Sequence, residues 1–299
     1  MRINFVFGQV VSFESLAENT VALDGAVQGP KLDPKTRRYS FDHHADCIRL
    51  ITLATCQQVF AAIFLGGLIV DNETTVVINE LDADTILSVW LLKNPGRVNE
   101  PAVKELVDRV GYTDSHGPAF APHWLHFQLS SWKKEDQTMA FLEKCLGLID
   151  QFFAGELKEP AARPTRESIG FGWHPLKGWA EVQTQNGFGD LYKSGFLAGF
   201  LAEPQADGTV TYTVAKKSDL VDLPVGPSHV DRNADPASYR SDTVLGSLAL
   251  LELEANPSQA HKANWGGGSS VGGSCRNEDK SASRLTPEQV LEVFKRFTK

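Results

Sequence analysis

A short run of β-branched residues, TTVVIN at residues 74–79, constrains the fold of this chain more than any other segment. Such a run is typical of a strand that is buried on both faces, as strands in parallel sheets are. The sequence LDADTILSVWLL follows after one residue, Glu80, and predicts a helix over Asp84 to Lys93. A buried strand that leads straight into an apolar helix is a βα unit, and therefore indicates an α/β fold.

The same alternation of short apolar runs and longer helical stretches extends through the first half of the chain. TVALDG at residues 20–25 predicts a further strand. Helices are expected over Cys47 to Leu65, Glu100 to Val110 and Asp136 to Phe153. The sequence therefore predicts a doubly wound, mainly parallel sheet in an N-terminal domain of residues 1–157.

Between about Leu157 and Gly172 the composition changes to Pro, Arg, Gly and Glu, which indicates a domain boundary. A smaller α/β domain is expected over residues 172–299. Its predicted elements are two strands within 196–215 joined by a turn, a helix over Asp242 to Ala255, and a last helix capped by Thr286 that runs to about Phe297.

Composition limits the classes of partner that this chain can bind. There are 29 Lys and Arg residues against 37 Asp and Glu residues, a net charge of −8, which disfavours binding to a long nucleic-acid duplex. A small phosphorylated compound or nucleotide held through metal ions remains compatible with this charge. The oligomeric state, including a homodimer, is left open.

The sequence also predicts a soluble, cytoplasmic protein. The longest apolar run, Val59 to Val70, is only about two-thirds of the length needed to cross a bilayer. The first residues lack a basic region followed by a long apolar stretch. The four cysteines contain no C-x-x-C pair and are too sparse for a disulfide scaffold, which suits a reducing compartment.

The segment FDHHAD, residues 41–46, is the main candidate for a metal site. It places the carboxylate of Asp42 beside the imidazoles of His43 and His44, in what we expect to be a turn before a helix. Oxygen and imidazole ligands together suit Mn²⁺, Mg²⁺, Fe or Zn²⁺, and two ions about 4 Å apart can clamp a phosphoryl group. In the alternative interpretation, Asp42 caps the following helix and both histidines are solvated.

Three further segments offer carboxylates. Asp82 and Asp84 come just after the 74–79 strand, at the sheet edge where open α/β sheets bind ligands, although either could instead cap the next helix, an effect of about 1 kcal/mol. Asp114 lies in GYTDSHG, which we expect to be a loop, and could bridge two ions. Asp24 is a candidate that also matches a common Asp-Gly turn.

A glycine-rich stretch near the end of the chain, residues 265–274, is the candidate substrate-binding loop. Glycine lets backbone amides approach an anion, and an arginine fork suits phosphate. The candidate contacts are Gly266, Gly267, Gly268, Ser269, Gly272, Gly273 and Arg276. The alternative interpretation of this stretch is a flexible linker.

Taken together, FDHHAD, the LDAD segment with Ser88 one turn into its helix, and GGGSSVGG resemble the DHH phosphoesterase superfamily with its DHHA1-type C-terminal domain. The resemblance implies two Mn²⁺ or Mg²⁺ ions in the N-terminal domain and a glycine-rich loop that closes over a phosphorylated substrate. By position it implies that Asp42, Asp82, Asp84 and Asp114 are metal ligands, that His43 is a ligand or a neighbour of the attacked phosphate, and that His44 matches the third residue of the D-H-H motif. It also implies that Gly266 to Gly273 and Arg276 contact phosphate, and Asp24 is a further candidate metal ligand.

The chain departs from the family pattern in three ways. In the superfamily the D-x-D motif precedes D-H-H, whereas here it follows by about forty residues. The usual histidine upstream of D-x-D is replaced by Asn79 or Glu80, and Ser269 stands where G-G-G-H has a histidine. Three explanations of the inverted order are open: a permuted N-terminal region, an earlier ligand supplied by Asp24, or an accidental likeness of LDAD.

The sequence thus predicts a metal-dependent hydrolase of phosphoester or phosphoanhydride bonds that acts through a metal-activated water. His43 or His44 would orient that water or protonate the leaving group. Two alternatives are a catalytically degenerate protein that binds a nucleotide or phosphate, and a mononuclear zinc or iron hydrolase assembled from His43, His44 and Asp114.

Overall fold

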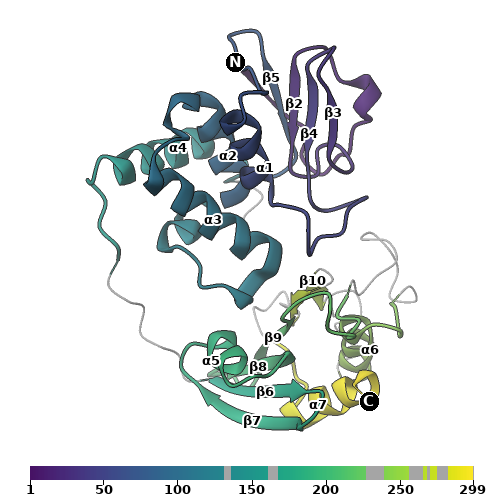
Figure 1. Cartoon of the computed structure of the whole chain (residues 1–299). Helices are drawn as coiled ribbons and strands as arrows, with labels where there is room; N and C mark the ends of the chain where they lie inside the picture. The colour runs from purple at the N-terminus through teal and green to yellow at the C-terminus, as the bar shows by residue number, and fades with distance from the viewer. Residues whose placement is uncertain are drawn as a thin grey trace. The chain divides into compact units, whose positions relative to one another are not determined.

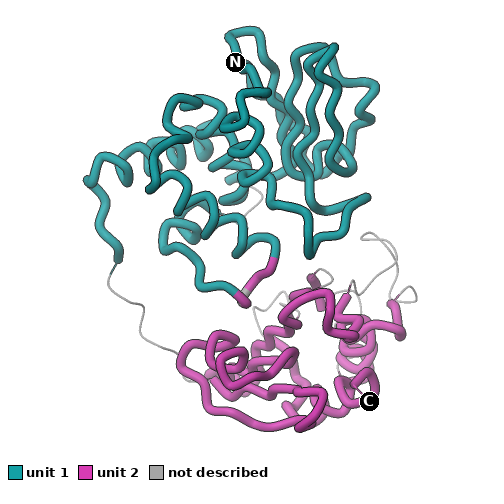
Figure 2. The backbone as a smooth tube through the Cα atoms, in the orientation of Figure 1, with its two compact units in different colours: residues 1–115, 120–161 teal, residues 116–119, 162–299 magenta. Residues whose placement is uncertain are grey.

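A computed structural model of the chain describes residues 1–130, 136–160, 168–226, 239–255, 265–267, 270–274 and 282–298. Contacts between residues divide the chain into two compact units (Figure 2). Unit 1 comprises Met1–Ser115 and Phe120–Ala161, and unit 2 comprises His116–Ala119 and Ala162–Lys299. The change of unit after residue 161 falls in the Pro- and Arg-rich stretch.

Unit 1 is built on a five-stranded mixed sheet that is mainly parallel (Figure 1). Its strands are β1 (Arg2–Phe5), β2 (Thr20–Leu23), β3 (Lys31–Asp33), β4 (Arg38–Phe41) and β5 (Thr75–Ile78). Their order across the sheet is β1-β5-β2-β4-β3, and only β3 runs antiparallel to its neighbour. The α/β class is therefore confirmed, and the carboxyl ends of β5, β2 and β4 lie side by side.

The helices of unit 1 include a buried helix, α2, that follows β5. They are η1 (Phe13–Ser15), α1 (Thr55–Phe64), α2 (Ala83–Lys93), η2 (Pro95–Arg97), α3 (Pro101–His116), η4 (Trp124–Gln128) and α4 (Met139–Phe153). Every residue of α2 from Ala83 to Leu92 is buried, and α2 packs against both α1 and α4. The predicted helix over Asp84 to Lys93 is confirmed as the centre of this core.

Two sequence expectations in unit 1 are wrong, and tertiary contacts explain both. The helix expected from Cys47 begins only at Thr55, because Asp84 accepts hydrogen bonds from the backbone N–H groups of Thr55 (2.9 Å) and Cys56 (2.8 Å) and so fixes the helix start. The loop expected around Asp114 is instead the last turn of α3. α3 continues through Gly111, which packs closely on α1: a Cβ at this position would lie 2.6 Å from side-chain carbons of Gln57.

Unit 2 contains a six-stranded antiparallel sheet in the order β10-β11-β9-β8-β6-β7. The strands are β6 (Ser168–His174), β7 (Gly178–Thr184), β8 (Ala198–Pro204), β9 (Val210–Lys216), β10 (Gly266–Gly267) and β11 (Val271–Gly273). The helices are η3 (Gly117–Ala119), α5 (Phe188–Lys193), α6 (Val244–Ala255) and α7 (Pro287–Phe297). Its largest fully buried side chains include Phe200, Tyr212, Trp265 and Phe294.

Several local predictions for unit 2 are confirmed. The two strands expected within 196–215 are β8 and β9, and the helix expected over Asp242 to Ala255 is α6. Thr286 caps α7 and forms a capping box with Gln289, as the sequence indicates. Among the described residues, no helix combines the length and apolarity that a membrane span requires.

Candidate metal centre

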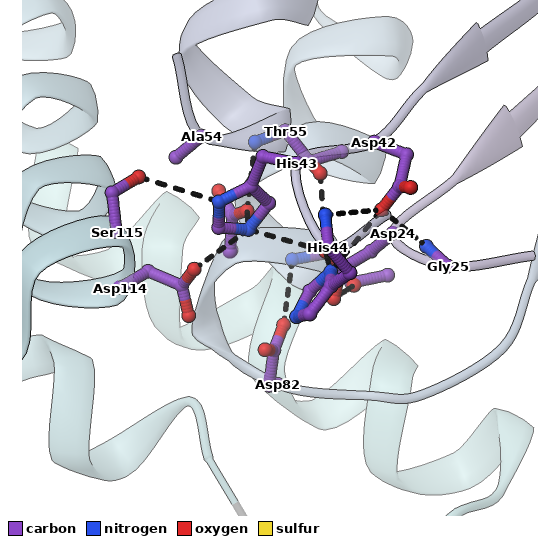
Figure 3. Close-up of polar contacts among 12 residues, drawn as sticks. Asp24, Gly25, Asp42, His43, His44, Ala54, Thr55, Asp82, Asp114 and Ser115 are labelled. Carbon is purple, nitrogen blue, oxygen red and sulfur yellow. Dashed lines mark hydrogen bonds and ion pairs between the residues drawn. The ribbon is translucent and has the colours of Figure 1, made fainter. Parts of the chain in front are cut away.

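Four segments of unit 1 bring acidic and imidazole side chains together at one edge of the sheet (Figure 3). Asp24 follows β2, the D-H-H segment follows β4, and Asp84 lies in the first turn of α2, after β5. Because β5, β2 and β4 are neighbouring parallel strands, their carboxyl ends meet. The fourth segment is the last turn of α3, which carries Asp114.

His43 lies at the centre of this cluster, and its side chain is fully buried. Its Nε2 atom lies 2.8 Å from Asp114 Oδ2, 3.5 Å from Asp24 Oδ1 and 3.7 Å from Asp84 Oδ2. Its other ring nitrogen, Nδ1, lies 3.4 Å from Ser115 Oγ. One imidazole nitrogen therefore faces three carboxylates that belong to three different elements.

The contact between His43 and Asp114 has the separation of an ion pair but not the geometry of a hydrogen bond. His43 Nε2 and Asp114 Oδ2 are both buried, and neither has a hydrogen-bond partner in the described part of the chain. Buried polar atoms are nearly always hydrogen-bonded. Two buried polar atoms that face each other without a hydrogen bond therefore require an explanation. Atoms that point at a common cation would have this arrangement, and the residues present therefore fit a metal ion.

Asp24 is a central member of the cluster. Its Oδ1 lies 3.2 Å from His44 Nδ1 and accepts a hydrogen bond from Thr55 Oγ1 at 3.1 Å, while its Oδ2 accepts one from Thr85 Oγ1 at 3.3 Å. The backbone φ angles of 48° at Asp24 and 72° at Gly25 agree with the Asp-Gly turn that the sequence indicates. Asp24 is thus both the first residue of the Asp-Gly turn and a candidate metal ligand.

Two groups of side chains have ligand atoms close enough to hold one cation, and His43 belongs to both. The first comprises Asp24, His43 and His44, the second comprises His43, Asp84 and Asp114, and within each group the ligand atoms lie within 4.8 Å of one another. Asp42 and Asp82 belong to neither group. The structure therefore brings four other sequence-predicted site residues together around His43.

Asp42 anchors the loop that carries the two histidines. Its carboxylate accepts hydrogen bonds from the backbone N–H groups of Gly25 (3.1 Å), Gly29 (2.8 Å), His44 (3.0 Å) and Ala45 (3.3 Å). Its Oδ1 also lies 3.2 Å from His44 Nδ1. The alternative in which Asp42 caps the following helix is wrong, because α1 begins at Thr55.

Asp82 and Asp84 differ in their contacts. Asp82 is the N-cap residue of α2 and accepts a hydrogen bond from Thr85 N at 2.8 Å, so the capping interpretation is confirmed for Asp82. Asp84 points to the neighbouring helix, where it accepts from the first amides of α1, and its Oδ2 also faces His43. Both of its oxygens thus link α2 to α1.

The charges in the cluster strongly perturb its titration. Burial works against protonation of His43, but contacts with Asp114 and Asp24 outweigh it and raise the pKa of His43 to about 10. Burial also lowers the pKa of His44, but contacts with Asp24 and Asp42 outweigh this effect and raise it to about 11. Burial, together with Asp114 and Asp24, raises the pKa of Asp84 to about 7. Without a metal ion, protonated histidines therefore compensate the carboxylates.

The glycine-rich stretch lies in unit 2, where its described residues form a pair of short strands. Gly266 and Gly267 form β10 and pair with Gly273 and Gly272 of β11, so these four residues are not a flexible linker. A Cβ at Gly272 would lie 2.5 Å from Leu245 Cδ1, so close packing accounts for this glycine. Gly268, Ser269 and Arg276 lie outside the described residues.

Sequence reasoning did not identify several residues that hold the cluster. Thr55 and Thr85 donate to Asp24, and Ser115 contacts His43. Arg49 donates to the backbone carbonyls of Asp114 and Ser115. No local pattern marks these residues, although Thr85 and Ser115 each adjoin a predicted ligand in the sequence.

Comparisons of the chain with protein-family models, with curated proteins and with solved structures found no match. The interpretation of this site rests on its geometry and chemistry.

Proposed function

We propose that this protein is a metal-dependent hydrolase that cleaves phosphoester or phosphoanhydride bonds in a small phosphorylated compound, a nucleotide or a short oligonucleotide, with Mn²⁺ or Mg²⁺ as cofactor. The proposal includes membership of the DHH phosphoesterase superfamily, with unit 1 as the catalytic domain and unit 2 as the DHHA1-like substrate-binding domain. One observation supports it most: His43 Nε2 is buried within 3.7 Å of three carboxylates and lacks a hydrogen bond in the described chain.

The donor set suits the cations in the proposal. His43 offers a nitrogen ligand, and Asp24, Asp84 and Asp114 offer carboxylate oxygens, a combination that Mn²⁺ accepts readily and that Mg²⁺ accepts chiefly through its oxygens. Several carboxylates that share a small buried volume repel one another unless a cation lies between them. Two cations would be held by Asp24, His43, Asp84 and Asp114, with His43 bound to one of them, which leaves His44 outside the ligands.

The cations and the surrounding residues would have different roles. Bound divalent cations supply the chemistry of a nucleophilic water at neutral pH and neutralise charge on phosphoryl oxygens. Thr55 and Thr85 hold Asp24 in place, and the amides around Asp42 fix the loop of the two histidines. His44 is 44% exposed, with Nδ1 held by Asp24 and Asp42, so its ring can orient water or protonate a leaving group.

Metal content and turnover test this function together. The protein, purified without chelator and supplied with Mn²⁺, should contain about two ions per chain by mass spectrometry, as a two-metal site requires. Asp114→Asn should weaken Mn²⁺ binding by more than the roughly 10–100-fold that loss of an outer-shell partner causes. Asp46→Asn is the matched control, because Asp46 is exposed and lies in the same loop but in neither group.

Activity is measured on a panel of phosphomonoesters, phosphodiesters, pyrophosphate and dinucleotides. Turnover should require Mn²⁺ or Mg²⁺ and be lost in Asp114→Asn but kept in Asp46→Asn. Absence of bound metal from the wild-type protein would refute the proposal. One ion per chain would favour a mononuclear hydrolase, and metal and ligand binding without any turnover would favour a degenerate binding protein.

A further inference from the structure

Arg49 lies in the loop after the D-H-H segment, and its side chain reaches the end of α3. Its Nη2 donates to the backbone carbonyl of Asp114 at 2.9 Å, and its Nε donates to that of Ser115 at 3.3 Å. Nη2 also lies 3.6 Å from Asp114 Oδ2. Two hydrogen bonds on one edge of the guanidinium therefore fix its plane beside a candidate metal ligand.

One end of the Arg49 guanidinium is not engaged by the residues that the structure describes. Nη1 has no hydrogen-bond partner among the residues that the structure describes. The Arg49 side chain is 28% exposed, whereas the Asp114 side chain beside it is 18% exposed. The protein fixes the orientation of this guanidinium and leaves N–H donors unused next to the candidate metal ligands. A positively charged group with these properties is suited to bind an anion.

The position of Asp114 connects Arg49 to the centre of the site. One side-chain oxygen of Asp114, Oδ2, lies 2.8 Å from His43 Nε2 and 3.6 Å from Arg49 Nη2. The guanidinium and His43 therefore both lie next to the same buried carboxylate oxygen, and an anion bound at this centre would lie close to Arg49. The carboxylates of the cluster would repel such an anion, so a fixed positive charge at this place offsets part of that repulsion.

We infer that Arg49 is a substrate-contacting residue that donates to a phosphoryl oxygen held at the centre formed by Asp24, His43, Asp84 and Asp114. This inference rests on the proposed function and extends it to a specific residue and to the charged group of the substrate. The contact with substrate requires the guanidinium fork, because the fork donates hydrogen bonds to two carbonyls of α3 and to the phosphoryl oxygen at the same time. A lysine ammonium supplies the charge without this fixed geometry.

The test is binding of inorganic phosphate to the Mn²⁺-loaded protein, measured by titration calorimetry. Arg49→Ala should weaken phosphate binding by about 10–100-fold, as expected for a charge-assisted hydrogen bond, and leave the Mn²⁺ content unchanged. The affinity of Arg49→Lys for phosphate should lie between that of Arg49→Ala and that of the wild type. Free guanidinium at millimolar concentration should restore part of the binding in Arg49→Ala but add nothing to Arg49→Lys or the wild type.

Arg2→Gln is the matched control, since Arg2 is an exposed arginine of unit 1 that pairs with Glu73. Phosphate binding as tight in Arg49→Ala as in Arg2→Gln would overturn the inference, as would failure of the wild type to bind phosphate. Loss of Mn²⁺ from Arg49→Ala in parallel with phosphate would also overturn it, because Arg49 would then only hold α3. A wild type that binds phosphate through Arg49 without hydrolysing any panel substrate would refute the hydrolase function and leave this inference standing.

Discussion

The two units present their candidate functional residues in opposite ways. In unit 1, acidic and imidazole side chains from four separate segments meet at His43, and His43 Nε2 and Asp114 Oδ2 are buried without a hydrogen-bond partner in the described part of the chain. In unit 2, the described candidates are four glycines of two neighbouring strands, which pair with each other and pack on Leu245. The four described glycines of unit 2 are thus explained by strand pairing and close packing, whereas the cluster of unit 1 contains two facing buried polar atoms that have no hydrogen-bond partner in the described part of the chain.

The comparison predicts that the two units respond differently to metal. Mn²⁺ at about 1,000 times its dissociation constant should stabilise unit 1 by about 4 kcal/mol, because the ion binds only the folded cluster. Native-state hydrogen exchange measures this separately for each unit. Amides of β2, β4 and β5 should gain protection, and those of β8 and β9 should not. Equal gains in both units would break the comparison.

The glycines of unit 2 should be needed for packing. Gly272→Val should destabilise unit 2 by about 3 kcal/mol, since even its Cβ would lie 2.5 Å from Leu245 Cδ1 and 2.9 Å from the carbonyl oxygen of Gly266. Urea denaturation measures the loss, and the Mn²⁺ content should be unaffected. Gly189→Ala is the control, because its nearest neighbour lies 3.9 Å away. Unchanged stability in Gly272→Val would remove the packing explanation.

One glycine of unit 1 should matter for both stability and metal binding. Gly111→Ala should cost about 2 kcal/mol, because its Cβ would lie 2.6 Å from side-chain carbons of the buried Gln57. The displacement of α3 should also weaken Mn²⁺ binding through Asp114, which calorimetry detects. Gly147→Ala in α4 has no neighbour within 4 Å and should be neutral or slightly stabilising. Intact metal affinity in Gly111→Ala would show that α3 tolerates the shift.

The smallest predicted effect is the dependence of metal affinity on pH. Burial opposes protonation of His43, yet nearby Asp114 and Asp24 raise its pKa to about 10, so the metal-free site holds this proton at pH 7. A metal ion must displace it, and affinity should therefore rise about tenfold, or about 1.4 kcal/mol, per pH unit from pH 8 to 9, where Asp84, whose pKa is raised to about 7 chiefly by burial, is already ionised. Calorimetry in two buffers counts the released protons. A slope near two would show that His44 also loses its proton.

The fold was predictable where local pattern determines it. The strands β2 and β5 and the helices α2, α6 and α7 follow from β-branched runs, apolar periodicity and a capping box. The D-H-H segment was also identified as part of the site. These features depend on residues that are near one another in the sequence, and so the sequence alone contains the information.

The rest of the site depends on contacts between distant residues. Asp24 matches a common turn, and its role emerges only because β2 lies between β5 and β4. Asp114 was expected in a loop, because Gly111 and the Asp-Ser-His-Gly segment resemble a turn. In the structure α3 runs on to His116, and Gly111 packs closely on the distant residue Gln57. The start of α1 is likewise determined by Asp84, which is far away in the sequence.

The order of strands in the sheet has a consequence for how such a site can be inherited. Asp24, the D-H-H segment and Asp84 meet because β5, β2 and β4 are spatial neighbours, whatever their order along the chain. A gene rearrangement that places the same strands in a different order along the chain, with new connections between them, would leave the cluster intact. Searches that require motifs in a fixed order would then miss such proteins, whereas searches for the spatial arrangement of side chains would recover them.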